Sequence, residues 1–144
     1  MRILSGLYGV LRPLDRIQPY RLEMGRKIET DLGSSLYSYW GDRIGAELDL
    51  ISNGVIINLA STEYFKATGK NMKSKIITPS FKEERDGTLK MIGFFAKKAR
   101  GTMARFIIQN KIKNPSDLNK FNLDGYKYSK KDSSEFSPVF LRKN

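Results

Sequence analysis

The sequence contains no cysteine and no histidine. The missing cysteine excludes disulfide bonds, a disulfide-linked partner, thiolate metal sites and a cysteine nucleophile. Without histidine, the Ser-His-Asp and Cys-His catalytic arrangements are excluded as well, and a metal site would consist of carboxylates alone. We therefore expect neither a metal nor a cofactor, and any acid–base chemistry falls to Asp, Glu, Lys or Tyr.

Long hydrophobic runs are also missing. The longest are strand-sized, such as Val-Ile-Ile at 55–57, whereas a helix needs about 20 apolar residues to cross a bilayer. The first residues lack a hydrophobic region followed by a small-residue cleavage site. We expect a cytoplasmic protein with no membrane partner.

Acidic residues are few relative to basic ones. The 144 residues include 26 Lys and Arg against 15 Asp and Glu, giving a net charge of +11 and a pI near 9.9. This balance is typical of nucleic-acid-binding proteins, although ribosomal, membrane-surface and other soluble basic proteins share it. With 40% apolar residues, the chain is long enough for one compact domain over residues 1–144.

One segment, Ala96 to Asn114, concentrates positive charge. At about 100° per residue, its apolar side chains form the core-facing stripe of an amphipathic helix; these are Ala96, Ala99, Met103, Phe106 and Ile107. The segment has no acid, and its six cations are Lys97, Lys98, Arg100, Arg105, Lys111 and Lys113. A polyanion is the natural partner of such a helix. The alternative is a solvated helical face, because Lys and Arg are good helix formers with apolar stems.

Patterns along the chain predict a mixture of helices and strands. Gly, Pro and Asp-Gly signals separate periodic segments. We expect strands at 2–5, 54–60 and from 126, a hairpin of 75–81 with 88–95, and helices from Ser34 to 51, at 61–68, at 96–112 and from 117. Ser34 or Ser35 and Ser61 are the expected N-caps. The fold class is therefore α+β (mixed α/β).

Several long motifs follow one another along the chain. They are ILSGLYGVLRPLDRIQPYRLEMG, YWGDRI, INLASTEYFK, ITPSFKEERDGTLK, FFAKKARGTMARFIIQNKI and FNLDGYKY. In these motifs the chain resembles the YaaA peroxide-stress family over nearly its whole length. Family members have roughly 250 residues, and the motifs lie in their C-terminal part. We therefore expect an N-terminal portion to be missing, and an open sheet edge is a candidate dimer contact.

The resemblance implies a YaaA-like fold, a role in lowering hydrogen peroxide damage, and DNA binding through a helix-hairpin-helix-like element. In this sequence the element spans residues 96–121: the helix 96–112, the connection 113–116 and the short helix from Asp117. Such an element presents backbone N–H groups and cations to phosphates, so it binds duplex or structured DNA without reading bases. The turn, IKNPSD, departs from the usual motif because it has no glycine.

The first and third motifs also place polar residues directly after strands, where ligand clefts form in open α/β sheets. This candidate pocket consists of Ser5, Tyr8, Asp15, Tyr20, Ser61, Glu63, Tyr64 and Lys66. Glu63 is the candidate catalytic group, and Tyr8 or Tyr20 would stack on a base. Alternatively, Glu63 stabilises the first turn of its helix and the tyrosines are core edges.

Two functions from different classes follow. The first is a non-enzymatic protein that binds DNA largely without sequence specificity and protects the genome in peroxide stress or limits reactive iron near it. The second is an enzyme acting on a nucleobase or nucleoside through Glu63.

Overall fold

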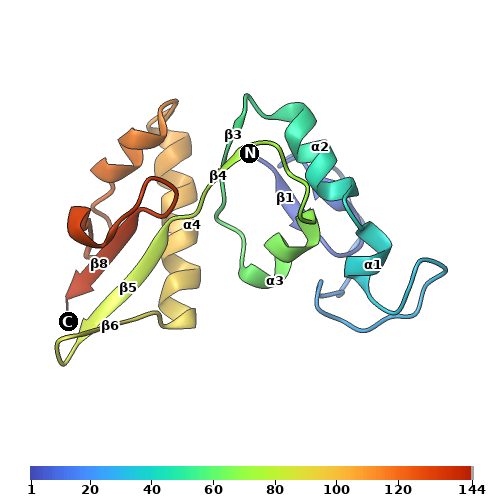
Figure 1. Ribbon diagram of the computed structural model, residues 1–144, viewed down its shortest axis with the longest axis horizontal. Coiled ribbons are helices and arrows are strands. Elements are labelled where there is room, and N and C mark those ends of the chain that lie inside the picture. Colours follow the sequence, from blue (N-terminus) through green and yellow to red (C-terminus); the bar gives the residue numbers. More distant parts are fainter. Residues whose placement is uncertain (144) are drawn as a thin grey trace. The chain divides into compact units, whose positions relative to one another are not determined.

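The computed structural model describes residues 1–143, which divide into two compact units. The first unit comprises Met1–Gly54 and Ala60–Ser74, and the second comprises Val55–Leu59 and the chain from Lys75 onward. Helices and strands occur in both (Figure 1), so the predicted α+β class is confirmed. A single domain over 1–144 and a missing N-terminal portion stay predictions.

The first unit combines one β-hairpin with short helices. The strands β1 (Ile3–Ser5) and β2 (Gly9–Leu11) pair antiparallel. The helices are α1 (Leu36–Trp40), α2 (Arg43–Ile51), α3 (Thr62–Phe65) and the 3₁₀ turn η1 (Lys66–Thr68). Gly9 has a φ of 72°, and a Cβ there would lie 2.8 Å from the Trp40 ring. The hairpin can therefore sit against α1 only with glycine at this position.

The helix expected from Ser34 to 51 is interrupted. Ser35 caps α1, since its Oγ accepts the Ser38 N–H at 3.2 Å. The helix then stops at Gly41, whose φ of 51° and ψ of −126° are not helical. A second helix, α2, begins two residues later. The predicted cap is confirmed, and the prediction of one continuous helix is wrong, because glycine readily leaves the α region.

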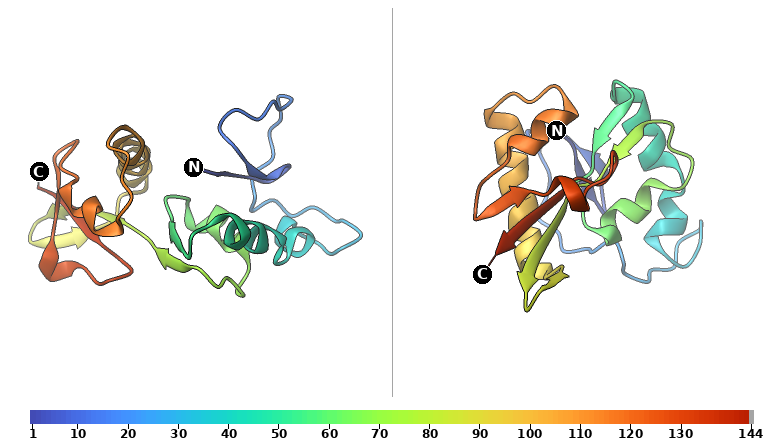
Figure 2. Two further views of the ribbon diagram at one scale, coloured as in Figure 1. Left: turned by 90° about the horizontal axis from the view of Figure 1, so that it is seen from above. Right: turned by 60° about the vertical axis from the view of Figure 1, so that its left-hand side comes forward.

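The second unit contains two sheets. A parallel pair joins β3 (Val55–Ile57) to β4 (Lys75–Ile77). The larger sheet has the order β6-β5-β8-β7, in which β5 and β8 are parallel and the other pairs antiparallel. Its strands are β5 (Ser80–Arg85), β6 (Thr88–Lys90), β7 (Tyr126–Tyr128) and β8 (Val139–Lys143). The helix α4 (Gly93–Gln109) packs against β5 (Figure 2), and two 3₁₀ helices, η2 (Pro115–Lys120) and η3 (Lys130–Asp132), complete the unit.

The predicted hairpin forms, with different limits. Asp86 and Gly87 make its turn with φ values of 50° and 71°. The segment 75–81, however, is two strands separated at Pro79, which has no N–H to donate to a ladder. The second hairpin strand ends at Lys90, and residues 93–95 are already helical. Strand β8 has no counterpart among the sequence-based predictions.

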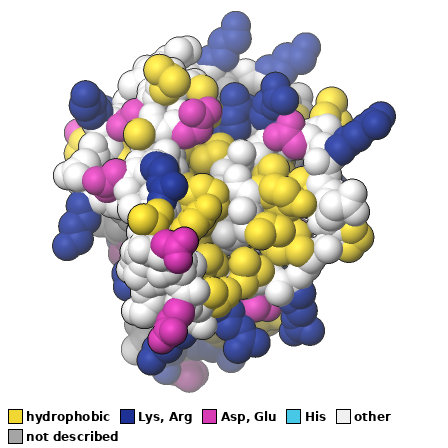
Figure 3. Space-filling model, turned by 90° about the vertical axis from the view of Figure 1, so that its right-hand side faces the viewer, with side chains coloured by type: hydrophobic (Ala, Val, Ile, Leu, Met, Phe, Trp, Pro, Cys, Tyr) yellow, Lys and Arg dark blue, Asp and Glu magenta, His cyan; other side chains and the backbone are white. Residues whose placement is uncertain are grey.

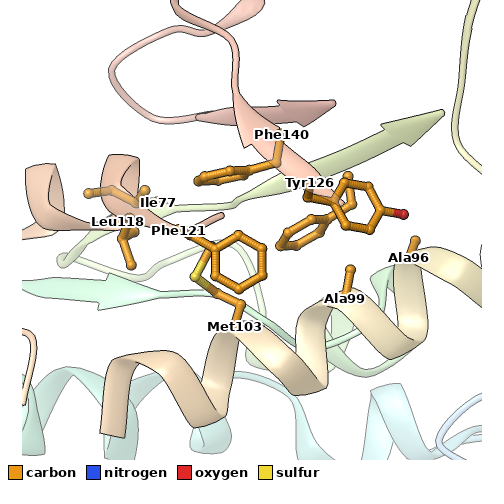
Figure 4. Packing of buried hydrophobic residues seen from close by; sticks show 9 residues of the cluster. Ile77, Ala96, Ala99, Met103, Leu118, Phe121, Tyr126 and Phe140 are labelled. Carbon is orange, nitrogen blue, oxygen red and sulfur yellow. The ribbon is translucent and has the colours of Figure 1, made fainter. Parts of the chain in front are cut away.

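The core of the second unit lies between α4 and the larger sheet. Ala96, Ala99 and Met103 are buried and face an aromatic cluster (Figure 4), which confirms the predicted apolar stripe. In that cluster, the ring of Phe81 lies 5.4 Å from those of both Tyr126 and Phe140. Burying each such side chain contributes about 1.5–3 kcal/mol, so this packing fixes the orientation of α4 and hence the direction of its outer face.

Candidate nucleic-acid interface

The outer side of α4 and the turn after it carry most of the predicted cations. Lys97, Lys98 and Arg105 are exposed on the helix, and Lys111 and Lys113 are exposed just beyond its end. They are held there because the opposite stripe is buried. The structure therefore exposes five of the six predicted side chains, three on α4 and two just after it.

Arg100 differs from the other five. Its side chain is partly buried, and its Nε donates a hydrogen bond to the Ala96 carbonyl oxygen at 3.3 Å. Burial lowers the pKa of the Arg100 guanidinium from its usual value. Arg100 thus packs along the helix and is less exposed to solvent than the other five cations are.

No carboxylate neutralises this helix from within its own segment. The sequence has no Asp or Glu between Asp86 and Asp117. Within residues 1–143, none of the six cations lies within the 4.0 Å ion-pair distance of a carboxylate oxygen. The nearby acids have other partners, since Asp117 pairs with Lys120 at 2.7 Å and Asp124 accepts the Thr102 hydroxyl at 2.7 Å. The positive charges of α4 remain available to an external anion.

The end of α4 is an αL turn built on lysine. Lys111 has a φ of 49°, and its N–H donates to the Ile108 carbonyl at 3.2 Å. The Ile112 N–H reaches back to Ile107 at 3.0 Å, and the Ile112 side chain packs on the core. This is the Schellman pattern, in which glycine is the usual αL residue. The turn places Lys111 and Lys113 on either side of Ile112, which is partly buried.

After this turn the chain enters η2, which is a 3₁₀ helix beginning at Pro115. The first helix was predicted at 96–112 and spans Gly93–Gln109, and the short helix was predicted from Asp117 and begins at Pro115. Its identity as a helix-hairpin-helix motif stays a prediction.

The side of the structure that carries α1 and α2 shows charges of both signs. Figure 3 looks toward the side of Figure 1 that carries α1 and α2, and hydrophobic side chains gather at its centre, with both basic and acidic side chains around them.

The polar residues predicted to form a pocket are brought together only in part. Ser5 is buried, its Oγ lies 2.5 Å from the Tyr20 hydroxyl oxygen, and it accepts the Tyr8 N–H at 2.9 Å. The rings of Tyr8 and Tyr20 meet edge to face at 5.5 Å. Asp15 lies apart from them and pairs with Arg12 at 2.9 Å, and hydrogen bonds from Arg12 lower the pKa of Asp15.

Glu63 forms a second group with the loop before α1. Its exposed carboxylate accepts the Gly25 N–H at 2.8 Å, and its carbonyl oxygen accepts the Tyr37 hydroxyl at 3.1 Å. Burial raises the pKa of Tyr37 and of Tyr64, and the Glu63 charge adds to both effects. In this arrangement Glu63 ties a loop to α3.

The two remaining pocket candidates have local roles. Ser61 caps α3 by accepting the Tyr64 N–H at 3.4 Å. The Lys66 ammonium lies 4.7 Å from the centre of the Tyr37 ring. A hollow of about 380 Å³ in the first unit has a different lining, formed by Asp42, Gly45, Ala46, Asp49, Leu50, Thr68, Asn71 and Lys73. A pocket around Glu63 stays a prediction.

One polar cluster was not predicted from the sequence. Glu83 of β5 is fully buried, and its carboxylate accepts the Tyr126 hydroxyl and, at 2.7 Å, the Arg142 Nε. Burial and the Glu83 carboxylate raise the pKa of Tyr126. The available signal was strand alternation, which puts Glu83 on the same side of β5 as the core residue Phe81.

A metal-ligand cluster and a membrane-spanning helix are both absent from residues 1–143. No group of three or more Asp or Glu side chains is placed to hold a metal ion in this part of the chain. No helix there is both long and apolar enough to span a membrane.

Comparison with known proteins gave consistent matches. A family model described as "Peroxide stress protein YaaA" matches residues 1–132. UPF0246 proteins of Maricaulis maris, Shewanella denitrificans and Ruegeria pomeroyi are 55%, 54% and 52% identical to the chain over 99% of its length. The chain covers 56% of the first and 57% of the other two, so it spans about half the length of the curated relatives that it matches.

Proposed function

Because the chain belongs to the YaaA peroxide stress protein family, we propose that it binds DNA through the basic surface of α4 and serves in protection against hydrogen peroxide. The binding is largely independent of base sequence. The basic surface is defined as Lys97, Lys98, Arg105, Lys111 and Lys113, with Arg100 at its edge.

The observation that supports the proposal is the acid-free exposure of these cations on a helix whose other side is fixed in the core. Lysine and arginine at fixed spacing neutralise phosphates and release condensed counterions, which supplies affinity without base recognition. A mobile, mixed-charge surface would not concentrate potential in this way. Protection would then follow from covering DNA or from limiting reactive iron near it.

A charge reversal on α4 tests this function. In Lys97→Glu with Arg105→Glu, repulsion from phosphates should weaken duplex binding more than tenfold and flatten its dependence on salt. Fluorescence anisotropy of a labelled duplex across a salt series measures both effects, and circular dichroism verifies folding. Unchanged affinity in a folded variant would remove α4 from the interface.

The matched control is Arg16→Glu with Lys27→Glu. Both side chains are exposed in the first unit, outside helices and strands, and each double variant lowers the net charge from +11 by four. The control should keep most of the duplex affinity if position matters and lose as much as the α4 variant if only net charge matters.

The alternative function, an enzyme acting on a nucleobase or nucleoside, draws support from the Ser5, Tyr8 and Tyr20 cluster. The variant Glu63→Gln separates the two proposals. Under the DNA-binding proposal, it should leave duplex binding intact in the anisotropy assay. Under the enzyme proposal, it should abolish turnover of nucleosides, measured separately, without unfolding the chain.

A further inference from the structure

Phe94, in the first turn of α4, exposes an aromatic ring to solvent. Its exposed fraction is 76%, compared with 46% for Phe136 and 38% for Tyr20. A phenylalanine in water forgoes the hydrophobic stabilisation that burial would supply. A ligand that covers the ring would supply this stabilisation, and the side chains around Phe94 indicate which kind of ligand it is.

The exposed ring rests on a rigid base. The Phe94 ring meets that of Phe95 edge to face at 5.7 Å. The Arg142 guanidinium lies 4.3 Å from the centre of the Phe95 ring, and the Glu83 carboxylate fixes its Nε at 2.7 Å. Phe94 is thus an exposed ring on an ordered helix, which lowers the entropy cost of binding a flat ligand.

The same face of α4 carries cations. At about 100° per residue, Lys97, Lys98, Gly101 and Arg105 fall within about 60° of the direction of Phe94. Gly101 leaves an open place on this face, because apart from the adjacent residues and the backbone of the helix itself no described atom lies within 4 Å of where its Cβ would stand. We call this set, with Phe94, the aromatic-basic face.

We propose that the aromatic-basic face binds single-stranded DNA, with an unpaired base stacked on Phe94 and the flanking phosphates held by Lys97, Lys98 and Arg105. This inference rests on the proposed function and specifies its ligand. Inside a duplex, neighbouring pairs cover both faces of each base, whereas every unpaired base offers a π-face to an aromatic side chain. Gly101 lets the sugar–phosphate chain approach the helix between the cations.

Charge decides between this ligand and an apolar protein partner. Two copies meeting through the same face would bring Lys97, Lys98 and Arg105 of each against those of the other, which is unfavourable. With no acid between Asp86 and Asp117, the flexible strand of a polyanion suits both the ring and its neighbours.

The first test uses the full chain with a labelled 20-nucleotide thymidine oligomer and a labelled duplex of equal length at one salt concentration. Phe94→Ala should weaken single-strand binding about tenfold, since stacking on one base accounts for a loss of this order. Duplex binding should change less than twofold. The matched control is Phe136→Ala, which removes another exposed ring beside a lysine, Lys75 at 5.3 Å, and should leave both affinities unchanged.

A second variant gives a direct readout of stacking. Phe94→Trp should retain single-strand affinity, and its fluorescence should be quenched by the oligomer and not by the duplex. Trp40 is the only natural tryptophan, so the wild-type chain supplies the background.

Three results would overturn the inference: wild-type single-strand affinity in Phe94→Ala, equal losses for both DNA forms, or no quenching in Phe94→Trp. These failures are distinct from failure of the proposed function. If the α4 charge reversal abolishes duplex binding while Phe94→Ala behaves as wild type, the function stands and the single-strand site falls. If the wild-type chain binds neither form, both fall together.

Discussion

Glu83 shows how a charged side chain is accommodated inside a small core. Removing an ion from water is costly unless hydrogen bonds and an opposite charge replace its hydration. Glu83 has both, from the Tyr126 hydroxyl and the Arg142 guanidinium. Arg142 in turn lies over the rings of Phe95 and Tyr126, at 4.3 and 5.1 Å. Each member of the cluster therefore depends on the others.

At this scale we predict that Glu83→Gln lowers the free energy of unfolding by about 2 kcal/mol. The substitution keeps the volume, makes the hydrogen bond from the Tyr126 hydroxyl a neutral one, and leaves the Arg142 guanidinium without its counter-charge. Urea denaturation followed by circular dichroism measures the change.

The control is the neighbouring Glu84→Gln. Glu84 pairs with Lys143 at 3.6 Å near the surface, with 36% of its side chain exposed, so the loss should stay below about 1 kcal/mol. Equal destabilisation by the two variants would show that the buried network has no special weight.

At the scale of elements, the turn at the end of α4 combines backbone strain with part of the basic surface. A non-glycine residue in the left-handed region costs about 1–2 kcal/mol per residue, and Lys111 stands there with a φ of 49°. The lysine contributes a charge at the position where glycine would be the more stable residue.

We predict that Lys111→Gly raises the unfolding free energy by about 0.5–1 kcal/mol while weakening duplex binding, because the strain and a phosphate contact disappear together. Thermal melting and anisotropy on the same preparation measure both. Lys113→Gly removes an equal charge, and Lys113 is not among the described residues with a positive φ. It should weaken binding without adding stability; a gain in both variants would contradict the strain argument.

The elements with strong local signals were predictable. The stripe of α4 follows from helical periodicity, the Ser35 and Ser61 caps follow from their chemistry, and Asp86-Gly87 marks its turn. Strand β8 lacked such a signal, because its pairing with β5 joins residues 59 positions apart, as in Glu83 with Arg142. Gly41 marks the place where the helix breaks, but glycine also occurs inside helices, as Gly45 does in α2, so its presence alone did not predict the break.

In the candidate sites, too, features with a local signal were predictable, and features that depend on distant residues were not. Cations on the face opposite an apolar stripe must be exposed, which sequence alone indicates. The partners of Glu63 could not be read in this way, because the Gly25 N–H lies 38 residues away in the chain. Likewise, the support beneath Phe94 comes from Arg142, on a strand that the sequence analysis did not predict.

At the scale of the whole molecule, the carboxylate of Asp49 joins segments that are distant in sequence. Asp49 of α2 accepts the Lys73 N–H at 2.7 Å and the Ser74 N–H and hydroxyl at 2.9 and 2.6 Å. The Ser74 hydroxyl, followed by these backbone hydrogen bonds, lowers the pKa of Asp49 below its usual value.

The sign of the effect follows from that direction. A depressed pKa in the folded state means that Asp49 stabilises the fold fully above its unfolded pKa, about 3.9. This stabilisation disappears as the pH falls through the lower, folded value. We predict that Asp49→Asn has a lower melting temperature than wild type at about pH 6 and that the gap closes toward about pH 2. Melting curves across this range measure it, and a gap independent of pH would contradict the assignment.

The ion pair of Glu83 also fixes how the strands of the larger sheet align. Glu83, Arg142 and Tyr126 are direct partners in one row across β5, β8 and β7. A slip of β5 by one residue would turn Lys82 or Glu84 inward and point Glu83 to solvent, leaving the guanidinium without its partner. One charged row thus selects a single alignment of three strands, and Glu83 and Arg142 in that row are 59 positions apart in the chain. Correct assembly of this sheet is therefore tied to the last strand of the described chain.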